Sequence, residues 1–191
     1  MLSCSSTAQG IDRSAIAKCA SLSGDLERLE CFDQLAKEYG LAEAATTSLA
    51  TSDTGNWQVS EKINPIDDSK TVVLRLTAST GQNNFGRKVS FIARCTSGET
   101  EAYINWQDYL GSKADVLTRI GSAKATRKRW SLSTDSKATF SPTPIELLSS
   151  MSETTKFIAQ VTPYNENPVT AIFDTAGLKA ALKPLRETCA W

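Results

Sequence analysis

The residues of this chain best suited to covalent chemistry are its five cysteines: Cys4, Cys19, Cys31, Cys95 and Cys189. No two of them form the Cys-x-x-Cys pair that is typical of zinc ribbons and thioredoxin-like redox sites. Four lie in segments of regular apolar periodicity, where a cysteine is either a small buried apolar side chain or half of a disulfide. Cys4 lies outside such a segment and is unpaired, paired with another molecule or left over from processing.

The chain contains no histidine, which excludes whole classes of catalysis. Without an imidazole there is no Ser-His-Asp triad, no Cys-His nucleophile pair and no His-ligated metal. Asp67 and Asp68 are adjacent carboxylates, but neighbours on an extended segment point to opposite sides and cannot converge on one substrate atom. We therefore predict no catalytic, cofactor-binding or metal-binding residues, and a protein that acts by binding.

Two groups of charged residues are candidates for binding. Lys124 and the run Arg127, Lys128, Arg129 stand next to Trp130, and cations beside an aromatic ring can bind a phosphate or polyanion. The alternative is a solvated hairpin loop, which the equal numbers of basic and acidic residues favour, 21 of each. We keep Arg127, Lys128, Arg129 and Trp130 as a candidate interaction patch and expect no nucleic-acid partner.

The second group is Arg94, Arg119 and Asp174, which recur as polar positions among apolar strands. They form either a ligand-binding cluster of two cations and a carboxylate, or a structural ion pair inside the sheet. The structural interpretation predicts that Arg94 has a buried partner.

The composition is that of a folded protein, with 40% apolar and 22% charged residues in a chain of 191. Two short helices around Cys19 and Cys31 predict a helical hairpin module over residues 1–40. Residues 41–56 are rich in Ala, Thr and Ser and predict a linker. No apolar run approaches the ~20 residues that a membrane-spanning helix needs.

From Trp57 onward the apolar period changes to two, which predicts a β-rich domain over residues 57–191. Three strands with short turns, one of them at residues 81–86, predict an antiparallel meander. Further strands and two helices follow, the last helix capped by Asp174 or Thr175. The expected fold class is α+β: an antiparallel sheet or two-layer sandwich, with a disulfide-linked N-terminal helical hairpin and a C-terminal helix.

The four periodic cysteines predict two disulfides. Cys19 and Cys31 face each other across the helical hairpin, and a bridge from Cys95 to Cys189 ties the C-terminal tail to the sheet. The alternative for each pair is two reduced thiols. Disulfides indicate an oxidising setting, and hence an extracytoplasmic protein.

Several segments resemble the type VI secretion-associated VasI/TagO family. Residues 19–33 match a module, C-x-x-(I/L)-x-x-D-x-x-R-L-x-C-(Y/F)-D, of exported proteobacterial proteins. The later matches are Trp57 and residues 67–74, 92–95, 103–106, 119–121, 130–133, 173–178 and 189–191, so that the resemblance spans roughly residues 15–191. It implies an exported, periplasmic accessory protein, and the family offers no catalytic residues to carry over. Residues 1–5 depart from it, because they lack the basic and apolar regions of a signal peptide.

These observations predict a non-enzymatic accessory or interaction protein of an extracytoplasmic bacterial assembly associated with type VI secretion, with protein partners and no cofactor. Related domains in phages and prophages give the alternative of a virion structural protein, such as a capsid or tail decoration. A cell-wall enzyme is a second alternative, disfavoured by the missing histidine. The oligomeric state is left open.

Overall fold

The computed structural model describes residues 13–22, 24–39 and 53–191. The chain divides into two compact units, one within residues 1–50 and one within residues 51–191. Cys4 and most of the predicted linker, residues 41–52, lie outside the described residues. Residues 53–56 form a turn at the beginning of the second unit.

The first unit is a helical hairpin. Helix α1 spans Arg13–Ala20 and helix α2 spans Asp25–Glu38. The chain leaves α1 through a tight turn, in which the Leu22 N–H donates to the Cys19 carbonyl at 3.2 Å. Cys19 is buried and forms a disulfide with Cys31 of α2, with 5.4 Å between their Cα atoms. The hairpin and its bridge are present as the sequence predicted.

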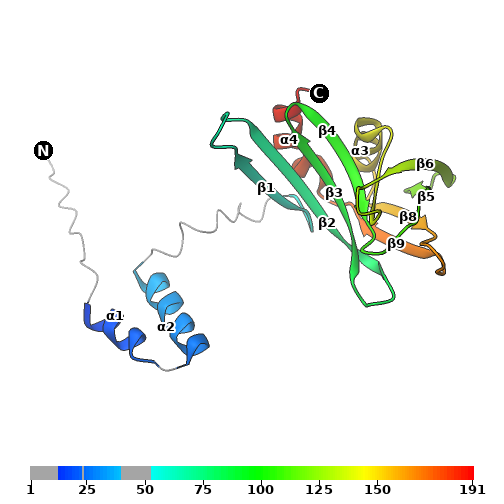
Figure 1. The fold of residues 1–191 in the computed structure, drawn as a ribbon. Coiled ribbons are helices and arrows are strands. Elements are labelled where there is room, and N and C mark those ends of the chain that lie inside the picture. The colour runs from blue at the N-terminus through cyan, green and yellow to red at the C-terminus, as the bar shows by residue number, and fades with distance from the viewer. Residues whose placement is uncertain (1–12, 23, 40–52) are drawn as a thin grey trace, which may run out of the picture. The chain divides into compact units, whose positions relative to one another are not determined.

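The second unit is built on one antiparallel sheet of nine strands (Figure 1). In chain order these are β1 Gln58–Ile63, β2 Lys70–Gln82, β3 Lys88–Thr96, β4 Glu99–Asn105, β5 Ala114–Ile120, β6 Thr126–Leu132, β7 Ala138–Phe140, β8 Lys156–Val161 and β9 Val169–Asp174. Their order in space is β1-β2-β3-β4-β7-β6-β5-β8-β9, and β2 also pairs with β9. This last pairing closes eight strands, β2 to β9, into a barrel, with β1 outside it on β2.

The predicted open sheet or sandwich is therefore wrong, and the reason lies in β2. The first half of this 13-residue strand pairs with β3, its register shifts after Thr77, and Thr80 then pairs with Ile172 of β9. Gly81, which the sequence placed in a turn, lies inside the strand with φ 118°. A Cβ there would lie 2.6 Å from the Thr170 carbonyl oxygen, so only glycine allows β2 and β9 to approach this closely.

Two helices complete the second unit. Helix α3 spans Pro144–Ser152 and packs against β4, and helix α4 spans Leu178–Cys189 and packs against β2 and β3. The N-cap of α4 is Gly177, not Asp174 or Thr175 as predicted. The backbone of the 53–56 turn approaches so closely that a Cβ on Gly177 would lie 2.2 Å from the carbonyl carbon of Thr54.

The core of this unit is apolar and centred on Phe91. The Phe91 ring lies edge-on to the rings of Trp57, Phe157 and Phe173, with centroids 5.7 to 6.1 Å apart. Leu178, Ala181, Leu182 and Leu185 of α4 are buried against the same cluster. The apolar side chains of the strands and of one face of α4 are removed from water together, so strands and helix share one core.

None of the described helices combines the length and the apolar character needed to cross a membrane.

Candidate functional site

The candidate interaction patch lies on β6, but its aromatic member does not face solvent. Arg127, Lys128 and Arg129 are exposed, whereas Trp130 is only 4% exposed. Side chains alternate along a strand, so Lys128 lies on the Trp130 side of β6 and the two arginines lie on the other side. The expected arrangement of cations around an exposed aromatic platform is therefore wrong.

The outer face of the patch is neutralised in part. The Arg129 guanidinium donates two hydrogen bonds to the carboxylate of Asp115 on β5, at 3.0 and 2.9 Å. These bonds lower the pKa of Asp115 from its ordinary value. Arg127 and Lys128 have no carboxylate within 4 Å in the described part of the chain.

The inner face of the patch borders a pocket of about 240 Å³. Strands β5 and β6 line one side of it and helix α3 lines the other, with the 141–143 loop between them. Its lining includes Thr126, Lys128, Trp130, Glu146 and Leu147. The pocket thus has an apolar base, formed by Trp130 and Leu147, and a polar rim that carries both a cation and a carboxylate.

Sequence reasoning found the β6 half of this pocket and missed the α3 half. Residues 126–130 stand out as a charged run, but Glu146 is an ordinary first-turn acid of a helix. The two are brought together because the short strand β7 pairs with β6 on one side and β4 on the other, and leads directly into α3. No local signal predicts that connection.

Arg94, Arg119 and Asp174 do not form a cluster in the described structure. Arg94 is hydrogen-bonded and ion-paired to Glu101, its direct neighbour on β4, which raises the pKa of the guanidinium. Arg119 is exposed on β5, and the Asp174 carboxylate accepts a hydrogen bond from the Ala176 N–H. The Arg94 and Glu101 side chains are 40% and 37% exposed, so the predicted buried partner of Arg94 is also wrong.

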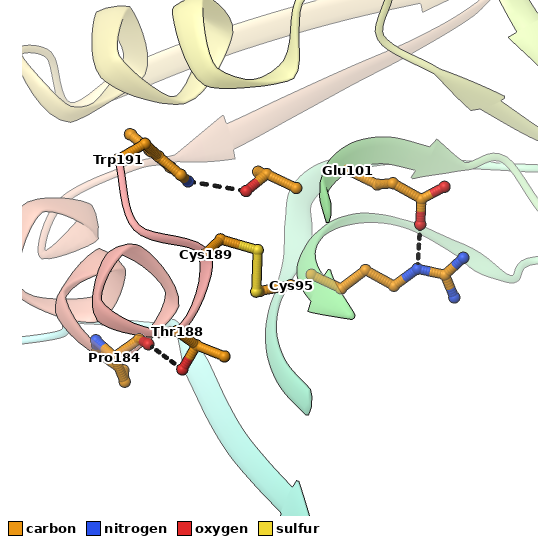
Figure 2. The surroundings of a disulfide bond; sticks show 8 residues. Cys95, Glu101, Pro184, Thr188, Cys189 and Trp191 are labelled. Atoms are coloured by element: carbon orange, nitrogen blue, oxygen red, sulfur yellow. Dashed lines mark hydrogen bonds and ion pairs between the residues drawn. A yellow bond between two sulfur atoms is a disulfide. The ribbon is translucent and has the colours of Figure 1, made fainter. Parts of the chain in front are cut away.

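The C-terminal tail is fastened to the β3–β4 hairpin at two points (Figure 2). Cys189, the last residue of α4, forms a disulfide with Cys95 of β3, as the sequence predicted. The Trp191 indole N–H donates to the hydroxyl of Thr100 on β4 at 2.8 Å. The Arg186 guanidinium lies over the Trp191 ring, 4.7 Å from its centroid. These contacts hold the end of the chain against the barrel.

A second exposed surface, which sequence reasoning missed, is formed by three aromatic side chains in separate loops. Phe85, Tyr109 and Tyr164 are 80%, 53% and 61% exposed. The Tyr109 and Tyr164 rings lie 5.9 Å apart, and the Tyr164 N–H donates to the Tyr109 carbonyl at 3.0 Å. The Asn83 side-chain amide donates a 2.7 Å hydrogen bond to the Gln107 carbonyl, which connects the loop of Phe85 to that of Tyr109. Aromatic side chains are common in protein interfaces, so this surface is a second candidate for an interface.

Comparisons with known proteins assign the family. The chain resembles the crystal structure of invasion associated protein b from Bartonella henselae, with a TM-score of 0.52 and 13% identity over 70% of this chain and 92% of that one. At this identity the likeness concerns the fold alone. A comparison with curated proteins finds no match. The model of the family described as "Type VI secretion system VasI, EvfG, VC_A0118" matches residues 18–191, and the chain therefore belongs to this type VI secretion-associated family.

Proposed function

We propose that this protein is a non-enzymatic accessory subunit on the periplasmic side of a type VI secretion apparatus, where it binds another protein. Membership of the VasI family supports the association with type VI secretion. The observation that supports the periplasmic location is the pair of disulfides, Cys19–Cys31 and Cys95–Cys189. Such bridges persist in oxidising compartments such as the bacterial periplasm and are rare in the reducing cytosol.

Two observations support binding as the activity. The chain has no histidine, and the ion pairs Arg94–Glu101 and Arg129–Asp115 join adjacent strands. Such cross-strand pairs hold neighbouring strands together, so these four charged side chains serve the fold. The pocket beside β6 and the exposed aromatic loops offer surfaces that a partner protein can cover.

Complementation tests the location. In a bacterium that lacks this protein, a version carrying a cleavable export leader should restore type VI-dependent killing of a competitor strain, and a version retained in the cytosol should not. A thiol-reactive polyethylene glycol should label the four paired cysteines of the exported version only after reduction. Full restoration of killing by the cytosolic version would contradict the proposal.

Incubation with peptidoglycan tests whether the protein is an enzyme. The oxidised protein, incubated with purified peptidoglycan, should release no soluble fragments above a heat-denatured control. Fragment release that a single carboxylate substitution abolishes would show instead that the protein is a cell-wall enzyme.

A further inference from the structure

We propose that the free edge of β6 binds an extended acidic segment of a partner protein by strand addition, and that side chains of this segment enter the pocket between β6 and α3. This inference rests on the proposed function for the existence of a protein partner. The segment is extended and acidic, and the surface that receives it is the β6 edge with the adjoining pocket.

Part of the β6 backbone has no strand beside it on one side. On the β7 side, Ser131 and Leu132 alone pair with a strand, opposite Phe140 and Thr139 of β7. Thr126–Trp130 pair with β5 and with no strand on their other side among residues 53–191. The Ser133 N–H donates to the Ala138 carbonyl, so the backbone groups of Ser133 face the β7 side. Backbone groups alternate between the two sides of an antiparallel strand, so those of Arg129 and Arg127 face the same side, where no strand is paired with them. Exposed edges of this kind are templates for another strand.

The side chains along this edge are positively charged. Arg127, Lys128 and Arg129 lie in sequence on the edge, and exposed Lys124 lies two residues before β6 begins. A second copy of this edge would bring like charges together, so the cations disfavour self-pairing. The same cations favour a strand that carries carboxylates. Arg127 and Lys128 are available for this, because the carboxylate of Asp115 pairs with Arg129.

The pocket between β6 and α3 adjoins this edge. A strand added to β6 alternates its side chains between the two faces of the sheet. On the inner face they meet Thr126, Lys128 and Trp130, and across the pocket Leu147 and Glu146 of α3. The apolar base suits an apolar side chain of the added strand, and Lys128 on the rim suits a carboxylate two residues away from that side chain. The residues between them point to the outer face of the sheet, where they meet Arg127.

A peptide selection tests the proposal directly. A library of random decapeptides is selected against the intact oxidised protein. We expect enrichment of Asp- and Glu-rich sequences, and binding of the best peptide should fall about tenfold or more in the variant Arg127→Glu/Lys128→Glu. The matched control, Lys88→Glu/Lys179→Glu, changes the net charge equally at exposed positions outside the pocket lining and should bind normally. If no peptide is enriched, or both variants bind alike, the proposal is wrong.

Backbone substitution separates strand addition from simple charge attraction. Methylating the peptide nitrogens one at a time should abolish binding at alternate positions only, because every second N–H faces β6. On the protein, Arg127→Pro removes an N–H that β5 does not use, whereas Arg127→Ala removes the charge alone. We expect the proline variant to bind more weakly than the alanine variant. An N-methyl scan without a two-residue period overturns strand addition even if the proline variant fails to fold.

These experiments use the purified protein, so their outcome is independent of its compartment. Peptide binding without rescue of secretion by the exported protein would contradict the proposed function and leave the strand-binding edge in place. Rescue of secretion without any peptide binding would contradict the strand-binding edge and leave the proposed function in place.

Discussion

At the scale of single residues, Arg94 shows how a polar residue in an apolar strand can still face solvent. Its neighbours Ala93 and Cys95 are apolar, which is why the sequence favoured an interior ion pair, and both are fully buried. Alternation instead points Arg94 out of the barrel, opposite Glu101 and 5.6 Å from the centroid of the Tyr103 ring. The pair is therefore a surface pair beside an aromatic ring.

We predict that Arg94→Ala lowers the free energy of unfolding by only about 1 kcal/mol or less, as exposed ion pairs do. Urea denaturation of the variant, with Arg94→Lys as a control that keeps the charge, measures the change. A loss of ~3 kcal/mol or more would be typical of breaking a buried ion pair and would contradict the exposed geometry.

A second prediction concerns the pKa of Asp115, which its hydrogen bonds from Arg129 lower. Arg129→Ala should raise this pKa toward the ordinary aspartate value, and Arg119→Ala should leave it where it is. Carboxyl chemical shifts followed through an acid titration report both. Because the folded-state pKa is depressed, the pair stabilises the fold above the unfolded-state pKa of aspartate, and the contribution disappears as the pH falls through the folded-state value. An unchanged titration in Arg129→Ala would show that the pair does not form in solution.

At the scale of elements, the sequence predicted which segments become strands and helices far better than it predicted how they close. A period of two identifies residues 101–105 or 157–161 as strands because one face must be buried. Closure of the barrel depends on Thr80 meeting Ile172, two residues far apart in the chain, and periodicity contains no information about partners. The same limit applies to the candidate site: the sequence singled out residues 127–130 as a possible patch, and no periodicity indicates that α3 packs beside them.

Gly81 is the element-scale test of barrel closure. Gly81→Ala places a methyl group 2.6 Å from the Thr170 carbonyl oxygen, at a φ of 118° that alanine rarely adopts. We expect a loss of stability of at least ~2 kcal/mol and faster hydrogen exchange of the β9 amides than of the β3 amides. Gly86→Ala is the control, since its added methyl has no atom within 4 Å although its φ is also positive. Equal effects of the two substitutions would mean that φ alone matters and that the close approach of β9 does not.

The helical hairpin depends on its own bridge. Ile16 and Leu29 are 40% and 57% exposed, and Cys19 alone is buried among the hairpin side chains whose burial the structure describes. The Cys19–Cys31 bridge closes a 12-residue separation, for which chain entropy predicts roughly 3 kcal/mol. We predict that Cys19→Ser/Cys31→Ser abolishes hydrogen-exchange protection in α1 and α2 and leaves that of the barrel strands unchanged. Loss of protection in both units would contradict this independence.

At the scale of the whole molecule, the barrel and its last helix form one core that the C-terminal tail completes. Cys95 lies at the end of β3 away from the β2–β3 turn, and Figure 1 shows α4 and the C-terminus at that end of the barrel. The exposed Phe85 lies in the β2–β3 turn itself. The tail contacts and the aromatic loops thus belong to different ends of β3, so the closure of the core at one end leaves the surface at the other available to a partner.

The last prediction is that the Cys95–Cys189 bridge stabilises the whole second unit. It closes a separation of 94 residues, and chain entropy alone predicts up to about 4.7 kcal/mol. For a domain of this size, 1 kcal/mol corresponds to roughly 2–4 °C in Tm, so Cys95→Ala/Cys189→Ala should melt on the order of 10 °C lower in a single transition. Reduction of the native protein with dithiothreitol gives the same loss without creating a cavity, and Cys19→Ser/Cys31→Ser is the control that should leave the main transition in place. Because α4 buries four side chains in the core and Trp191 is bonded to Thr100, removing the bridge should loosen helix, tail and strands together. A second, earlier transition confined to α4 would instead show that the helix is an appendage the barrel does not need.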